Sequence, residues 1–181
     1  WKTDNSKRPY VLRDDRINQA QKLVKTALGL LGADDPNRVR LQGKMDQLVQ
    51  MNNERRRINA ERTFMIPDAF GGSELKAIKK KAEALVTAKI SGCRVLRSTV
   101  ISDDWKEESV QEWTDTTHTA TRFRTTRSVT SQVAAKKADG EVRLYTLHIA
   151  KDRRSDGSWS KLYGNLHSDY GDLMLEKNVR D

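Results

Sequence analysis

Residues 118–151 read HTATRFRTTRSVTSQVAAKKADGEVRLYTLHIAK, and this stretch decides the fold. Two long runs of strand-forming residues, 118–137 and 141–151, flank the pair Asp139-Gly140. An Asp-Gly pair between two such runs is typical of a β-hairpin, because glycine supplies the positive φ that a primed turn needs. The stretch therefore predicts one long antiparallel hairpin.

The register of this hairpin follows from the turn. A two-residue turn at Asp139-Gly140 places Val133 opposite Thr146 and Arg127 opposite Asp152, and it predicts an ion pair between the last two. Apolar side chains then lie on both faces, which a hairpin with one wet face should not show. We expect the preceding helix to cover one face. The N-terminal helices, a pocket formed by the sheet itself, or a partner would cover the other.

The remaining pattern predicts an α+β fold in which helices precede a twisted antiparallel meander of about five strands. Apolar residues at three- and four-residue steps indicate helices up to residue 31, over 36–62 and from 73 to about 91. Asp35 and Pro36 suit the start of the second helix, and Ser73 suits the cap of the third. Further strands are expected at 95–101, 109–114 and 159–164, with a chain reversal at Asp103-Asp104.

Four segments are expected in the chain: an extended basic arm (1–13), a helical hairpin with an apolar loop (14–72), a helix-plus-sheet domain (73–164) and a C-terminal tail (165–181). The order of elements over about residues 73–164 resembles the cone-shaped nuclear-transport-factor-like superfold, although the strand that normally separates its helices is missing here. That resemblance implies a concave pocket, for which Trp113, Tyr145 and Trp159 are the candidates. The superfold hosts enzymes, binding modules and secretion-system scaffolds, so it implies no single function.

Composition excludes several classes of protein. The chain has 181 residues and a formal net charge of +9, with 34 basic and 25 acidic side chains. Its one cysteine, Cys93, excludes an intramolecular disulfide framework and a site of several thiolates. No apolar run approaches the length of a membrane-spanning helix. The chain begins at Trp1 rather than Met, which leaves export or removal of an N-terminal segment open and the compartment undetermined.

Catalytic motifs are missing from the sequence. His118, His148 and His167 do not show metal-ligand spacing, and no nucleophile elbow, phosphate loop or dinucleotide fingerprint occurs. The sequence therefore predicts a non-enzymatic protein with no cofactor and no metal site.

Two stretches are candidates for contact with a protein partner or a second copy. The long second helix turns polar at Arg55-Arg56-Arg57, and it either faces solvent or docks on another molecule. The loop after it is unusually apolar, so it either packs Phe64, Ile66 and Phe70 into the core or forms an exposed docking patch. The candidate partner-binding residues are Phe64, Met65, Ile66, Phe70, Arg55, Arg56 and Arg57.

The basic residues support an alternative function. Arg122, Arg124, Arg153 and Arg154 are candidates for binding an anion, and Lys76 to Lys81 would add to a nucleic-acid or anionic surface. The competing interpretation is cross-strand pairing with the acidic stretch 103–115. The leading hypothesis is a subunit or adaptor of a larger complex. The alternatives are a nucleic-acid or anionic-surface binder, and a small-ligand binder or enzyme with a cone-shaped pocket.

Overall fold

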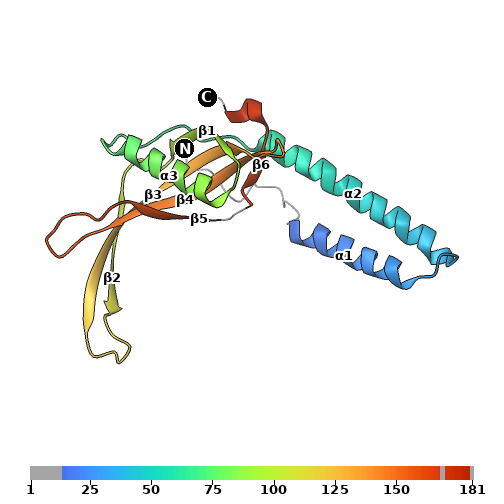
Figure 1. The fold of residues 1–181 in the computed structure, drawn as a ribbon, viewed down its shortest axis with the longest axis horizontal. Helices are drawn as coiled ribbons and strands as arrows, with labels where there is room; N and C mark the ends of the chain where they lie inside the picture. The colour runs from blue at the N-terminus through green and yellow to red at the C-terminus, as the bar shows by residue number, and fades with distance from the viewer. Residues whose placement is uncertain (1–13, 168–169, 180–181) are drawn as a thin grey trace. The chain divides into compact units, whose positions relative to one another are not determined.

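The computed structural model describes residues 14–167 and 170–179, and it confirms the α+β class (Figure 1). In these residues three α-helices accompany a six-stranded antiparallel open sheet. The chain divides into two compact units inside its longest helix, Trp1–Ile58 and Asn59–Asp181. The predicted basic arm, 1–13, lies outside the described residues.

The first unit is a pair of helices, α1 (Asp14–Leu30) and the larger part of α2 (Pro36–Arg62). Asp35 caps α2 as predicted, because its Oδ1 accepts a hydrogen bond of 2.8 Å from the Asn37 backbone N–H. Arg38 donates from Nη1 to the carbonyl oxygens of Leu28 (3.3 Å) and Leu31 (3.0 Å). These contacts satisfy carbonyls that the end of α1 leaves unpaired and hold the two helices as a hairpin.

The sheet of the second unit is built on two long central strands, β3 and β4. β1 and β2 pair with successive parts of β3, and β5 and β6 pair with successive parts of β4. The predicted reversal at Asp103-Asp104 is therefore wrong: the pair interrupts a strand course that keeps its direction along β3. The strands are β1 (Arg94–Val100), β2 (Lys106–Trp113), β3 (Thr121–Lys136), β4 (Val142–Asp152), β5 (Tyr163–Leu166) and β6 (Asp172–Met174).

The central hairpin is present, but its predicted register is off by one residue. Lys137 N–H donates to Glu141 O (2.8 Å) and Gly140 N–H donates to Lys137 O (3.0 Å), so the loop has three residues. Gly140 takes φ +87°, which is the left-handed residue of a type I turn with a G1 bulge. Val133 consequently lies opposite Tyr145 instead of Thr146, and each β4 side chain lies on the other face from the one predicted.

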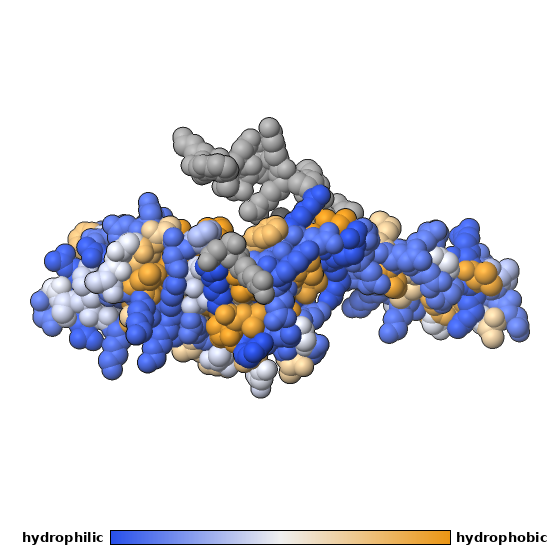
Figure 2. Space-filling model, turned by 90° about the horizontal axis from the view of Figure 1, so that it is seen from above, coloured by the Kyte–Doolittle hydropathy of each residue, from blue (hydrophilic) through white to orange (hydrophobic). Residues whose placement is uncertain are grey.

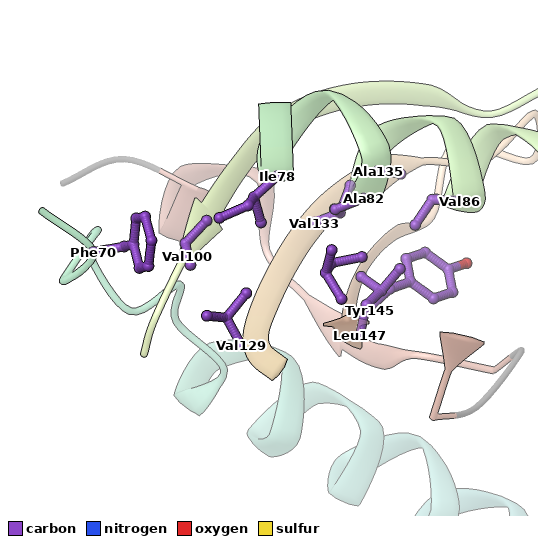
Figure 3. Packing of buried hydrophobic residues seen from close by; sticks show 11 residues of the cluster. Phe70, Ile78, Ala82, Val86, Val100, Val129, Val133, Ala135, Tyr145 and Leu147 are labelled. Atoms are coloured by element: carbon purple, nitrogen blue, oxygen red, sulfur yellow. The ribbon is translucent and has the colours of Figure 1, made fainter. Parts of the chain in front are cut away.

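Both faces of the proximal half of this hairpin are apolar, as expected. Helix α3 (Leu75–Lys89) covers one face through Ile78, Ala82 and Val86, which point toward β3 and β4 (Figure 3). The core of this face consists of those three residues with Phe70, Val100, Val129, Val133, Ala135, Tyr145, Leu147 and Ile149.

The second face is covered by the C-terminal tail and by Met65, which were not among the expected covers. Met174 and Val179 pack with Met65 against Ala134 and Leu144. The tail ends in a short 3₁₀ helix, Glu176–Val179. The tail thus closes the side of the sheet that α3 leaves open.

Asn178 fixes this tail to the end of α2. Its side-chain amide lies 3.1 Å from the carbonyl oxygen of Ala60, 3.0 Å from that of Glu61 and 3.0 Å from that of Thr63. Leu175 N–H adds a bond of 3.1 Å to Ala60 O. These carbonyls belong to the end of a helix and have no partner within it, so Asn178 acts as a cap supplied from far along the chain.

The turn at Gly140 yields a stability prediction. Gly140→Val should lower the free energy of unfolding by about 1 kcal/mol or more, because a β-branched residue resists positive φ. Gly71→Val is the matched control, since an added Cβ at Gly71 meets no atom within 4 Å and Gly71 has no positive φ. Urea denaturation of both variants measures the difference. Equal losses of stability would contradict the assigned turn.

The Asn178 cap yields a second prediction. Asn178→Ala should lower the free energy of unfolding by about 1–3 kcal/mol, because it leaves buried carbonyl groups unsatisfied. Asn165→Ala, which removes an exposed amide, should stay within about 0.5 kcal/mol of the wild type. If both variants unfold at the same urea concentration, the cap does not hold the tail.

Candidate docking surface

Residues 106–127, which we call the β2–β3 ribbon, form the distal part of the sheet, and the ribbon is two-stranded beyond the pairing of β3 with β4. β4 pairs with β3 only as far as Thr126, opposite Asp152, and Arg153 N–H then donates to Thr125 O at 2.8 Å. Beyond that point β3 is paired with β2 alone among the described residues, and Figure 1 shows the ribbon leaving the sheet. No residue of β2 is buried.

The ions of the ribbon neutralise one another across the two strands. Arg122 Nη2 lies 2.6 Å from Glu112 Oε1, and Arg127 Nε lies 2.7 Å from Glu107 Oε2. The interpretation of cross-strand pairing is thus confirmed for these arginines. The predicted Arg127–Asp152 pair is wrong, because the one-residue shift in register places Lys151 opposite Arg127.

Asp152 connects β4 to the base of the ribbon through hydrogen bonds and an ion pair. Burial alone would raise the pKa of Asp152, but hydrogen bonds from Thr126 Oγ1 (2.6 Å) and Tyr163 OH (2.8 Å), together with Arg124, hold it below its usual value. Arg124 Nη2 lies 3.3 Å from Asp152 Oδ2. The hydrogen bond from Arg124 to Tyr163 and the contact with Asp152 raise the guanidinium pKa in turn.

Apolar side chains project from the ribbon into solvent. Val110 is 52% exposed, Trp113 55% and Phe123 75%. Trp113 and Phe123 share one face, because Trp113 pairs with Thr121 and Phe123 with Gln111. The Trp113 ring packs at 5.0 Å from that of His118 in the tip loop. The ribbon therefore combines paired charges with exposed aromatic residues.

The apolar segment 63–72 divides its side chains between core and solvent. Met65 and Phe70 are buried, whereas Phe64 and Ile66 are 58% and 50% exposed. Core packing was expected for Phe64, Ile66 and Phe70, and it is right only for Phe70. Met65 is buried between the exposed Phe64 and Ile66, so the side chains alternate between the two sides at this point.

Backbone contacts hold this segment against the sheet. Ile66 N–H donates to Gln132 Oε1 (3.0 Å), and Asp68 Oδ1 accepts from Val100 N–H (2.8 Å). Lys79 Nζ lies 2.5 Å from Asp68 Oδ2. Burial alone would raise the Asp68 pKa, but Lys79 and the Val100 N–H hold it below its usual value. Seen from above, hydrophobic residues lie in separate small groups on a largely hydrophilic surface (Figure 2).

The three pocket candidates are not brought together. Trp113 lies on the ribbon, Tyr145 lies in the core at 1% exposure, and Trp159 belongs to a packed stack. In this stack the Lys151 ammonium lies 4.6 Å from the Trp105 ring and 5.5 Å from the Trp159 ring. Sequence reasoning missed Lys151, because an alternating strand gives no sign of which cation will be enclosed.

Charged side chains lie at both ends of this stack. Lys151 is 6% exposed, and its Nζ lies 2.5 Å from Glu74 Oε2. Glu74, not Ser73, precedes α3 at the cap position, and its side chain makes no cap bond. Arg127 lies with its guanidinium carbon 4.4 Å from the Trp159 ring centroid.

The remaining candidate arginines are spread over other elements. In α2, Arg57 pairs with Glu54 at 2.7 Å and Arg55 Nη2 donates to Asn52 at 2.9 Å, while Arg56 lies between them in sequence. Arg153 forms a backbone bridge with Trp159, and Arg154 O accepts from Gly157 N–H in the next turn. Anion binding by Arg153 and Arg154 stays a prediction.

Comparison with known proteins identifies no relative. No protein-family model, no curated protein sequence and no solved structure matches this chain. The resemblance to the nuclear-transport-factor-like superfold therefore stays a prediction. Over residues 14–167 and 170–179, no helix has the length and apolar character needed to cross a membrane, and no three His, Cys, Asp or Glu side chains gather as metal ligands.

The Lys151 stack yields a third prediction. Glu74→Gln should destabilise the fold more than Lys151→Met, because it leaves a buried ammonium without its counter-ion, whereas methionine fills the space without charge. We expect a cost of about 1–3 kcal/mol for Glu74→Gln, reduced from the buried-pair value because Glu74 is partly in water. Glu107→Gln, in an exposed pair, should cost about 0–1 kcal/mol. Thermal unfolding ranks the three variants, and the reverse order for the first two would refute this role of Glu74.

Proposed function

We propose that the protein is a non-enzymatic assembly subunit that associates with a second copy of itself through the outer edge of β2. The observation that carries this proposal is the lack of a strand partner on that edge among the described residues, together with the lack of any buried residue in β2. A two-stranded ribbon is marginally stable in water, and a third strand adds main-chain hydrogen bonds.

β2 has few of the features that usually prevent an edge strand from pairing with another chain. β2 contains no proline, and its pairing with β3 runs without a bulge from Lys106 to Trp113. Glu107 and Glu112 are neutralised by arginines of β3. The edge is therefore open to another strand.

The charges of β2 select one symmetric register for two antiparallel copies. A two-fold axis at Ser109 places Lys106 opposite Glu112 of the second copy and Glu107 opposite Gln111 of the second copy. Lys106 has no ion-pair partner within the described chain, so it gains one in this arrangement. An axis at Val110 would instead oppose glutamates 108 and 112, and an axis at residue 108 would oppose Glu108 to itself.

Substitutions at Gln111 test this register. In a symmetric dimer, Gln111→Glu places a glutamate opposite Glu107 of the other copy at two equivalent positions. This repulsion between like charges should raise the dimer Kd about 2- to 30-fold. Gln111→Lys is the matched control, because it places opposite charges together and should leave the Kd equal or lower. Sedimentation equilibrium of the full chain measures both. Gln111 is exposed, so neither change should alter the fold.

A cross-linking experiment fixes the axis directly. In a Cys93→Ser background, Ser109→Cys should form a disulfide dimer on mild oxidation, because opposed Cα atoms in antiparallel strands lie about 4.5–5.5 Å apart, within disulfide range. Val110→Cys, which opposes Glu108 of the second copy, should not cross-link. A monomer at all concentrations, or cross-linking by Val110→Cys alone, would overturn the proposed dimer.

A further inference from the structure

Two histidines lie side by side on the sheet, on the face opposite α3. His148 is in β4, and His167 follows β5 directly. Their ring centroids are 4.3 Å apart, with the ring planes at 71°. The neighbours Leu147 and Ile149 point into the α3 core, so His148 points to the other face, where both imidazoles are exposed.

The backbone fixes this juxtaposition. His148 pairs with Asn165 of β5, and His167 N–H donates to Thr146 O at 3.1 Å, so the two histidines are diagonal neighbours on adjacent strand courses. Gly164 lets β5 approach closely, because a Cβ there would lie 2.4 Å from the His148 carbonyl oxygen. The sheet therefore fixes the two histidines as diagonal neighbours on one face.

The fold gives these two imidazoles no hydrogen-bonding role. Among the described residues, neither ring donates or accepts a side-chain hydrogen bond, and neither lies in an ion pair. The ring nitrogens of these two adjacent side chains are therefore available to a common ligand.

We propose that His148 and His167 together bind one borderline divalent cation, of the class of Zn²⁺ and Cu²⁺. Imidazole nitrogens suit these ions and lie about 2.0–2.1 Å from zinc. Rotation of the exposed side chains brings one nitrogen of each ring to the ion, and water completes the coordination. Hard cations such as Mg²⁺ and Ca²⁺ are disfavoured, because they need oxygen ligands. The proposal goes beyond self-association and takes no ligand from β2.

Calorimetric titration tests the site. ZnCl₂ is titrated into the full chain without a polyhistidine tag, with MgCl₂ as the comparison ion. We expect one Zn²⁺ per chain and no heat of binding from Mg²⁺. His148→Ala and His167→Ala should each weaken Zn²⁺ binding by more than about tenfold, since even the loss of an outer-shell partner costs 10–100-fold. Both side chains are exposed, so the variants should retain the wild-type circular dichroism.

His118→Ala and Cys93→Ser are the matched controls. His118 is the remaining histidine and packs on Trp113 in the tip loop, and Cys93 is the single thiol. Both variants should bind Zn²⁺ as the wild type does. Absence of Zn²⁺ binding, equal binding by His148→Ala, or loss of binding in either control would overturn the proposal. These outcomes leave the oligomeric state untouched, so they are distinguishable from a failure of the β2 dimer.

Discussion

The structure depends on one constraint: the proximal half of the β3–β4 hairpin is apolar on both faces and must be covered on both. From Val129 to Ala135 each residue of β3 except Thr130 is buried. α3 removes one face from water, and the tail with Met65 removes the other. The elements between and around the strands are arranged to meet this demand, and the Asn178 cap holds the tail in place at the end of α2.

The covering of the two faces ends toward the N-terminal part of β3, where the buried residues of the strand give way to exposed ones. Residues 121–124 of β3 are exposed, and no residue of their partner β2 is buried. The transition is marked by the stack of Phe70, Trp105, Lys151, Trp159 and Arg127, in which Phe70 and Trp105 meet edge to face at 5.8 Å. Cations that lie against aromatic faces tolerate partial burial, because the ring attracts their charge. The stack can therefore lie between the buried core and the solvent-exposed ribbon.

Local signals predicted local structure well. Asp35 and Pro36 fixed the start of α2, and the three- and four-residue spacing of apolar residues located α3. The hairpin was also predicted, but its loop length was not, because Asp-Gly suits both a two-residue turn and a three-residue loop with left-handed glycine. That single residue places Lys151 instead of Asp152 opposite Arg127, and Arg127 pairs with Glu107 of β2 on its other side.

Contacts between distant segments escaped prediction for a physical reason. The Asn178 cap joins residues more than a hundred positions apart, and an asparagine in an irregular tail gives no sign of it. The closeness of His148 and His167 is of the same kind, since it exists only once β4 and β5 are aligned. The burial of Met65 beside the exposed Phe64 also depends on distant segments, because Met65 packs with residues of β3, β4 and the C-terminal tail.

The distribution of charge is compatible with the self-association at β2 that we propose for this protein of net charge +9. Residues 106–127 carry four basic and four acidic side chains, so the ribbon is neutral and the excess charge lies elsewhere. Repulsion between exposed charges is largely screened beyond a Debye length of about 8 Å at physiological ionic strength. A neutral ribbon therefore adds no net-charge repulsion to the dimer that we propose. The same neutrality argues against the ribbon as a phosphate site, because its arginines already face carboxylates at contact distance.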